Sequence, residues 1–354
     1  MSNAKIMGTG YYVPEHVLDN KFFERLNPLN IYGPDNQIIK TINTSDSIIR
    51  QMMGIKERRM ASNNKLMVEL GIREKYLDIP DQDTADLGAE AAKKAIKDAG
   101  ISVESIDGII VSTMTNLVGF PSAAAQIQEK IGAVNACECY DIAAACAGYC
   151  LNLDIIRSRT QTNPGIYLAV AAEHMTSIID YTGANSALFG DGAGAAVIGP
   201  SQSDKGILYS SNLSDPFGGK LMYIYKNSEN KLRMPEGNKV MLNAVKKMYS
   251  CTEKVMQKAG WSKNDVDLYI PHQANIRIID SLGAKLFHDY DKERKNKNSQ
   301  KIYCNIDRYG NISAACCAVA LAEAREKGII KDGSKVILTA IGSGLQTSAV
   351  AIQF

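Results

Sequence analysis

Two stretches of this sequence match each other at one fixed offset: Ala99-Gly-Ile-Ser-Val-Glu-Ser-Ile-Asp107-Gly-Ile-Ile110 and Ala259-Gly-Trp-Ser-Lys-Asn-Asp-Val-Asp267-Leu-Tyr-Ile270. Alanine, glycine, serine and aspartate recur at the same places, and the aliphatic positions agree. Each stretch follows a helical pattern that Gly100 or Gly260 is expected to end, and each leads into an apolar run. The match predicts a duplicated helix–turn–strand unit.

The later parts of the two halves also correspond. Two strand-like runs close each half, 166–171 with 193–198 and 335–341 with 348–354. Strands that alternate with helices of about 10–15 residues are typical of an α/β fold. We therefore predict two pseudo-symmetric α/β halves, residues 1–200 and 201–354, with the functional site where they meet.

Composition excludes several classes of protein. The chain has 354 residues, 45% of them hydrophobic, and a net charge of +2, which excludes a broad basic surface for nucleic acid. Polar residues and glycines interrupt the longest charge-free stretches, so no membrane span is expected. The eight cysteines form no paired CxxC motif, so we expect no metal site. The first residues do not form a secretory signal, so we expect a cytoplasmic protein with reduced cysteines.

One cysteine lies at a corner that suits a nucleophile. Cys146 stands in Ala143-Ala-Ala-Cys-Ala-Gly148, between an apolar strand that ends near Ile142 and an expected helix. The positive end of that helix would stabilise a thiolate. A buried cysteine that serves only as a small hydrophobic residue is the alternative.

Two residues of the second half occupy strand–helix junctions. His272, in Pro271-His-Gln-Ala-Asn275, follows an apolar strand, and ligands of α/β proteins collect at this end of the strands. Asn311, in Tyr309-Gly-Asn-Ile-Ser-Ala-Ala315, is predicted at an equivalent junction. The alternative for His272 is a capping or core histidine. For Asn311 the alternative is capping of a helix, and for this residue taken alone it is the better interpretation.

The combination of these motifs resembles the β-ketoacyl-acyl carrier protein synthase III family of thiolase-fold condensing enzymes. The resemblance covers nearly the whole chain. The further motifs that carry it, in order, are Gly8-Thr-Gly10, Thr44-Ser-Asp46, Gly54-Ile-Lys-Glu-Arg58, Phe120-Pro-Ser-Ala123, Phe189-Gly-Asp-Gly-Ala-Gly-Ala195 and Gly342-Ser-Gly344. It implies a thiolase-like fold with a layered αβαβα core.

By this resemblance, Cys146 accepts the acyl group from a thioester, and His272 and Asn311 hold a malonyl thioester while it loses carbon dioxide. The backbone N–H groups of Cys146 and Ser343 would form the oxyanion hole. The resemblance implies neither a cofactor nor a metal. The product of the implied reaction is a β-ketoacyl chain of fatty acid or related biosynthesis.

The same resemblance implies contacts with substrates and partners. Asn238 and Asn275 are similar to residues that bind the pantetheine arm, and Phe120 to one that crosses a homodimer interface. Arg277 resembles the basic residue that meets the acyl carrier protein, although a solvated helix charge is the alternative. The substrates would be an acyl thioester, carried by coenzyme A or by acyl carrier protein, and malonyl-acyl carrier protein.

The sequence departs from the family in the region 27–79. Ile48 and Met52 occupy the places of the tryptophan and arginine that clamp the coenzyme A adenine, which leaves the acyl donor open. Gly54-Ile-Lys-Glu-Arg58 is nearly repeated as Gly71-Ile-Arg-Glu-Lys75, so this region is longer than usual. Two other functions stay open: an acyltransferase of specialised metabolism that moves the acyl group to an alcohol or amine, and a non-catalytic partner subunit.

Overall fold

The computed structural model describes residues 3–33, 37–61, 81–219, 221–224, 231–235, 237–287 and 300–354, with only the backbone for 237–239. Its main feature is a sheet of nine strands in the order β13-β14-β15-β10-β1-β9-β8-β6-β7. The strands of the first half are β1 (Asn3–Tyr12), β6 (Gly108–Ser112), β7 (Glu138–Ile142), β8 (Tyr167–His174) and β9 (Asp191–Ser201). Those of the second are β10 (Gly206–Ser214), β13 (Leu268–Pro271), β14 (Lys335–Gly342) and β15 (Gln346–Gln353).

The two halves of the sheet share one pairing pattern. In the first half, β8 runs parallel to β6 and antiparallel to β9. In the second half, β14 runs parallel to β13 and antiparallel to β15. The halves join where β1 and β10 pair at Ala4 and Ile207.

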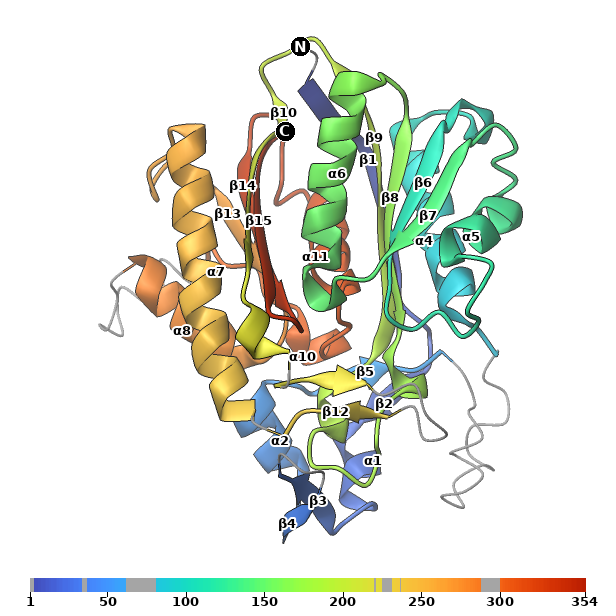
Figure 1. The fold of residues 1–354 in the computed structure, drawn as a ribbon. Coiled ribbons are helices and arrows are strands. Elements are labelled where there is room, and N and C mark those ends of the chain that lie inside the picture. The colour runs from blue at the N-terminus through green and yellow to red at the C-terminus, as the bar shows by residue number, and fades with distance from the viewer. Residues whose placement is uncertain are drawn as a thin grey trace.

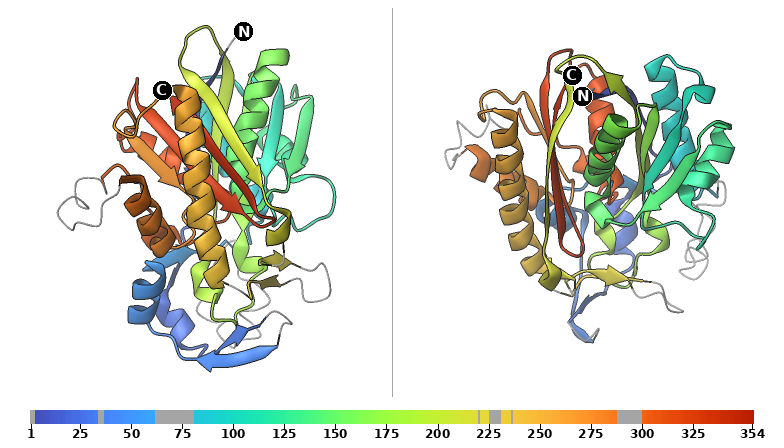
Figure 2. Two further views of the ribbon diagram at one scale, coloured as in Figure 1. Left: turned by 60° about the vertical axis from the view of Figure 1, so that its left-hand side comes forward. Right: turned by 45° about the horizontal axis from the view of Figure 1, so that its top comes forward.

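Helices form the other layers (Figure 1). Between the two halves of the sheet lie α6 (Gly148–Thr162) and α11 (Ala315–Glu326), packed in one hydrophobic core with residues of both halves. Outside the first half lie α4 (Thr84–Ala99) and α5 (Ala123–Ile131). Outside the second half lie α7 (Gly237–Ala259) and α8 (Ile276–Phe287). Figure 2 shows the same sequence of layers from two other sides. The predicted α/β fold with αβαβα layering is confirmed.

Local sequence explains where the duplicated helices begin and end. Asp83 caps α4 in a reciprocal capping box with Asp86. Gly100 and Gly260 follow α4 and α7 with φ of 65° and 67°, the left-handed conformation that ends a helix at low cost in glycine. Both predicted helix ends are confirmed. Gly8 lets β1 approach α4, since a Cβ there would lie 2.3 Å from the backbone nitrogen of Ala99.

Smaller elements cover one end of the layers, at the bottom of Figure 1. They are β2 (Val17–Asp19), α1 (Asn20–Glu24), β3 (Leu29–Tyr32), β4 (Ile38–Ile42), α2 (Asp46–Met53), β5 (Glu57–Arg59), β11 (Tyr223–Ile224), β12 (Leu232–Arg233) and α10 (Ile306–Tyr309). Within the region 27–79, β3 and β4 pair antiparallel ahead of α2. The near-repeat at 71–75 lies outside the described residues.

The second half departs from the predicted symmetry at its outer edge. Within the described ranges, the counterpart of β7 is reduced to a single bridge between Tyr269 and Ile302. Asn311 follows α10 instead of a strand, so its predicted strand–helix junction is wrong. Ahead of α10, two hydrogen bonds of Asn305 hold the chain in a turn. Its backbone N–H donates to the side-chain oxygen of Gln273 (3.0 Å), and its side chain donates to the carboxylate of Glu323 (2.9 Å).

Candidate active site

Cys146 lies where the sequence places it, between β7 and α6. It belongs to a short 3-10 turn, Ala145–Ala147, directly before α6, and its side chain is 6% exposed. Its Sγ lies 3.5 Å from Oγ of Ser313, which comes from the opposite half of the molecule. Cys146 is therefore a buried thiol at the boundary between the two halves.

Burial strongly affects the charge state of Cys146. It raises the pKa of this thiol to about 12, although the hydrogen bond with Ser313 acts in the opposite direction. Burial therefore opposes the predicted effect of the helix terminus, because a charge is costly in a buried site. Cys146 is a neutral thiol at pH 7.

Asn311 has one end of its carboxamide fixed. Its Oδ1 accepts a hydrogen bond from the backbone N–H of Ser313 (2.9 Å) and another from Sγ of Cys316 (3.6 Å). The side chain thus makes an Asx-type turn ahead of α11 and does not cap this helix, whose N-cap position is Ala314. Because Oδ1 is engaged, Nδ2 is the end that can donate to a bound substrate.

His272 directly follows β13, and its backbone N–H donates to the carbonyl of Thr339 (2.7 Å). The side chain is 2% exposed, and burial lowers its pKa to about 3. Its Nδ1 has no hydrogen-bond partner among the described residues. His272 is therefore a neutral imidazole at pH 7.

The first turn of α11 brings these three side chains into one region. Sγ of Cys316 contacts the carbonyl of Gln273, next to His272, at 3.8 Å and Oδ1 of Asn311 at 3.6 Å. Ser313 contacts both Asn311, through its N–H, and Cys146, through its Oγ. The segments that carry the cysteine, the histidine and the asparagine thus meet in one buried region, although they are far apart in the sequence.

The turn after β14 packs against the nucleophile segment. A Cβ on Gly342 would lie 2.8 Å from the backbone nitrogen of Cys146, so only glycine permits this approach. The half-buried Ser343 comes next, and its Oγ donates to the carbonyl of Met222. The turn is held beside the backbone of Cys146, where the sequence predicts the oxyanion hole.

The predicted substrate contacts lie around α8 and the loop after β6. Asn275 precedes α8, and its Oδ1 accepts from the backbone N–H of Arg277 (2.9 Å). Arg277 is exposed and donates to Sδ of Met52 on α2. Phe120 is 88% exposed. Asn238 lies in the first turn of α7, and its side chain lies outside the described residues.

Three residues of this region were not singled out from the sequence: Ser313, Cys316 and Glu173. Glu173 is a fully buried carboxyl group near the end of β8. A signal for it existed, because it is the one acidic residue in the apolar run Tyr167-Leu-Ala-Val-Ala-Ala-Glu173. Ser313 and Cys316 adjoin Asn311 in a quoted motif, but only the fold places them between the other groups.

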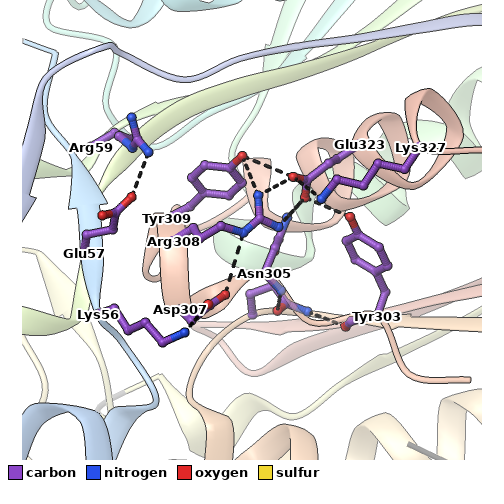
Figure 3. Close-up of polar contacts among 11 residues, drawn as sticks. Lys56, Glu57, Arg59, Tyr303, Asn305, Asp307, Arg308, Tyr309, Glu323 and Lys327 are labelled. Atoms are coloured by element: carbon purple, nitrogen blue, oxygen red, sulfur yellow. Dashed lines mark hydrogen bonds and ion pairs between the residues drawn. The ribbon is translucent and has the colours of Figure 1, made fainter. Parts of the chain in front are cut away.

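A second buried carboxyl group supports the loops that carry His272 and Asn311. Figure 3 shows Glu323 of α11 accepting hydrogen bonds from five side chains, those of Tyr303, Asn305, Arg308, Tyr309 and Lys327. Asn305 also donates its backbone N–H to Gln273. Glu323 thus ties the segment around α10 to the loop of His272.

The layered fold defines a class, that of thiolase-like condensing enzymes, and comparisons with known proteins agree. Residues 140–216 match the family model 3-oxoacyl-[acyl-carrier-protein] synthase III, and residues 256–354 match the model of its C-terminal part. The beta-ketoacyl-[acyl-carrier-protein] synthase III of Caldanaerobacter subterraneus is 37% identical over 370 residues, covering 99% of this chain and 98% of the relative. That of Staphylococcus haemolyticus is 38% identical over 356 residues and covers 99% of both chains.

A solved structure of the same family has a similar fold. The crystal structure of 3-oxoacyl-[acyl-carrier-protein] synthase III from Aquifex aeolicus superposes with a TM-score of 0.83 at 32% identity, covering 99% of this chain and 100% of that one. The chain therefore belongs to the 3-oxoacyl-[acyl-carrier-protein] synthase III family, as an acyltransferase of fatty acid biosynthesis.

Two further observations concern membranes and metals. Within the described residues, no helix combines the length and the apolar character that crossing a membrane requires. In the same part of the chain, no three histidine, cysteine, aspartate or glutamate residues are grouped to hold a metal ion.

Proposed function

We propose that Cys146 accepts an acyl group from a thioester and that the acyl-enzyme then condenses with a malonyl thioester. In the second step, His272 and Asn311 hold the thioester oxygen of the malonyl unit while it loses carbon dioxide. The carbanion that forms attacks the acyl-cysteine, and a β-ketoacyl product leaves.

The observation that carries this proposal is that the segments of Cys146, His272 and Asn311 meet around the start of α11. Loss of carbon dioxide creates a carbanion without removal of a proton, so the reaction needs hydrogen-bond donors and no strong base. A neutral imidazole and a carboxamide with its oxygen already engaged are such donors. In a buried site they stabilise a developing enolate more strongly than they would in water.

Acyl transfer passes through a tetrahedral oxyanion, which needs donors of its own. The backbone N–H groups of Cys146 and Ser343 are proposed to supply them. The close packing of Gly342 against Cys146 supports this assignment, because it keeps the turn beside the nucleophile. Residues 1–200 would then supply the nucleophile, and residues 201–354 the donors for decarboxylation.

Malonyl-acyl carrier protein is the proposed extender, in line with the names of the relatives. The exposed Arg277 is proposed to meet the carrier protein, and Asn275 and Asn238 the pantetheine arm. Ile48 and Met52 are each 42% exposed on α2, and Met52 contacts Arg277. Neither can clamp an adenine as the family's tryptophan and arginine do, so acyl-carrier protein joins acyl-coenzyme A as a candidate donor.

Assembly and location complete the proposal. Phe120 stands with Leu117 and Val118 in an exposed apolar group, which supports a homodimer in which Phe120 enters the partner. All eight cysteines are free thiols, which supports a reducing cytoplasm.

The test separates the two half-reactions. The protein is incubated with a panel of acyl-coenzyme A and acyl-carrier thioesters, and the mass added to Cys146 is measured. Malonyl-acyl carrier protein is then added, and carbon dioxide release is followed. His272→Ala and Asn311→Ala are expected to keep acylation and to slow carbon dioxide release about 100-fold or more.

Acylation of Cys146 without carbon dioxide release in the native protein would favour acyl transfer to another acceptor and refute condensation. No acylation by any thioester would refute the role of Cys146. Equal loss of acylation in both variants would contradict the proposed division between the two half-reactions.

A further inference from the structure

The contact between Cys146 and Ser313 continues to a third group. Ser313, whose Oγ lies 3.5 Å from Sγ of Cys146, also acts as a side-chain partner that lowers the pKa of Glu173, and the N–H of the next residue, Ala314, donates to Oε1 of Glu173 (3.4 Å). The segment of Ser313 therefore contacts both the thiol and a fully buried carboxyl group. Among the described residues, no hydrogen bond joins the His272 side chain to the thiol, and Nδ1 of His272 has no hydrogen-bond partner.

Neutral groups surround Glu173. Its Oε2 accepts from the hydroxyls of Thr113 (3.3 Å) and Thr115 (2.9 Å) and from the N–H of Met114 (3.0 Å). Its Oε1 accepts from the N–H of Ala314 (3.4 Å). Every hydrogen-bond donor recorded for Glu173 in the described ranges is uncharged, so these donors hold an anion without neutralising it.

Two thiols respond to the charge of Glu173. Cys146, from the turn before α6, and Cys316, from α11, both have their pKa raised by burial first and also by the charge of Glu173. The pKa of Glu173 itself is raised by burial. Loss of the thiol proton to water would place two negative charges in one buried site, whereas transfer to Glu173 keeps the charge at one.

The backbone on each side of the contact is strained. Among the described residues, the non-glycine positions with positive φ are Ala145, at 46°, and Ser313, at 49°. The first directly precedes Cys146, and the second presents the hydroxyl that meets Sγ. Such conformations persist where the surrounding structure enforces them, and they cluster at functional sites.

From this geometry we propose that Ser313 and Glu173 form a proton relay that activates Cys146 for acyl transfer. The inference rests on the proposed role of Cys146 as acyl acceptor. The thiol gives its proton to Ser313 Oγ while Ser313 gives its own to Glu173. The thiolate forms the new carbon–sulfur bond, and the carbon–sulfur bond of the donor thioester breaks. The expelled thiolate regains the proton along the same path, which leaves Glu173 ionised again.

The test measures the rate of Cys146 acylation against pH in single turnovers, by mass, for the full chain and for Glu173→Gln, Ser313→Ala and the double variant. Each single variant is expected to acylate about 10²–10⁴-fold more slowly at pH 7. Its rate should rise with pH more steeply than that of the native protein, because solvent must then remove the proton. The double variant should be no slower than the slower single variant, since both substitutions cut one path.

Thr160→Val is the matched control. It removes a buried hydroxyl of α6 that donates to the carbonyl of Ile156 (2.8 Å) and, within the described part of the chain, has no recorded bond to Glu173, so acylation should keep its native rate and pH profile. Acyl-enzyme of each variant, prepared by long incubation, should condense at near the native rate, because decarboxylation needs no thiol proton.

Several results would overturn the relay. The first is that the single variants acylate at the native rate. The second is that they acylate more slowly but with an unchanged pH profile. The third is that the effects of the two substitutions on the acylation rate add in the double variant. Absence of acylation in the native protein would instead refute the proposed role of Cys146, so the two failures are distinguishable.

Discussion

Replacing Glu323 by glutamine removes a single buried charge and little volume. The carboxyl group is 1% exposed and accepts hydrogen bonds from the five side chains around it (Figure 3). Its cationic partners, Arg308 and Lys327, have side chains 34% and 46% exposed, so both stay hydrated after the substitution. The variant therefore reports the loss of the carboxylate and leaves no buried cation unpaired.

The pKa of Glu323 sets the size of the effect. Burial alone would raise this pKa, but the hydrogen bonds, led by that of Arg308, lower it from 4.5 to about 2. A carboxyl group with this depressed pKa contributes about 3 kcal/mol to the free energy of unfolding. The contribution is fully present above pH 4.5 and is lost as the pH falls toward 2.

The assay is urea unfolding of the native protein and Glu323→Gln, followed by circular dichroism from pH 7 downwards. Protein concentration stays fixed, because association would shift the midpoint. The difference in unfolding free energy should be about 3 kcal/mol at pH 7 and should shrink as the pH falls below 4.5.

The control is Glu90→Gln, which breaks an exposed ion pair with Lys93 and should change stability by about 0.5 kcal/mol or less. A difference for Glu323→Gln that stays constant across the pH range would refute the reasoning. So would a difference at pH 7 no larger than that of the control.

Three further predictions concern the active site. Because burial lowers the pKa of His272 to about 3, carbon dioxide release by preformed acyl-enzyme should not lose activity with a midpoint near pH 6.5; a titration there would contradict the neutral, buried imidazole. Gly342→Ala should slow acylation about 100-fold or more, since its Cβ would lie 2.8 Å from the backbone nitrogen of Cys146; a native rate in the same mass assay would refute the close approach. Cys316→Ala removes one of two donors to Oδ1 of Asn311, so carbon dioxide release should fall a few-fold relative to acylation; an equal fall in both rates would show a different role for Cys316.

Much of the fold can be predicted from this sequence because its signals are local and occur twice. Gly100 and Gly260 end helices at matching points, and the runs that follow them become β6 and β13. The apolar runs at the ends of the two halves become β8 with β9 and β14 with β15. A repeated pattern provides an internal check, because one half tests the interpretation of the other.

The remaining features depend on contacts between distant parts of the chain. Glu173 accepts a hydrogen bond from the N–H of Ala314, 141 positions away, and no spacing rule predicts that contact. The predicted junction before Asn311 is wrong because Glu323 and Gln273 draw the segment of Asn305 into a turn. The charge states of the site residues cannot be predicted from the sequence either, because they depend on burial, which only the folded chain defines.

Burial acts in opposite directions on the two half-reactions. It strengthens the neutral donors His272 and Asn311 toward an enolate, because a site of low polarity screens their dipoles weakly. The same burial raises the pKa of Cys146 to about 12. Titration by solvent would then leave roughly one thiol in 10⁵ ionised at pH 7. A single site can serve both steps if the thiol proton has an acceptor inside it, and Glu173, reached through Ser313, is placed to be that acceptor.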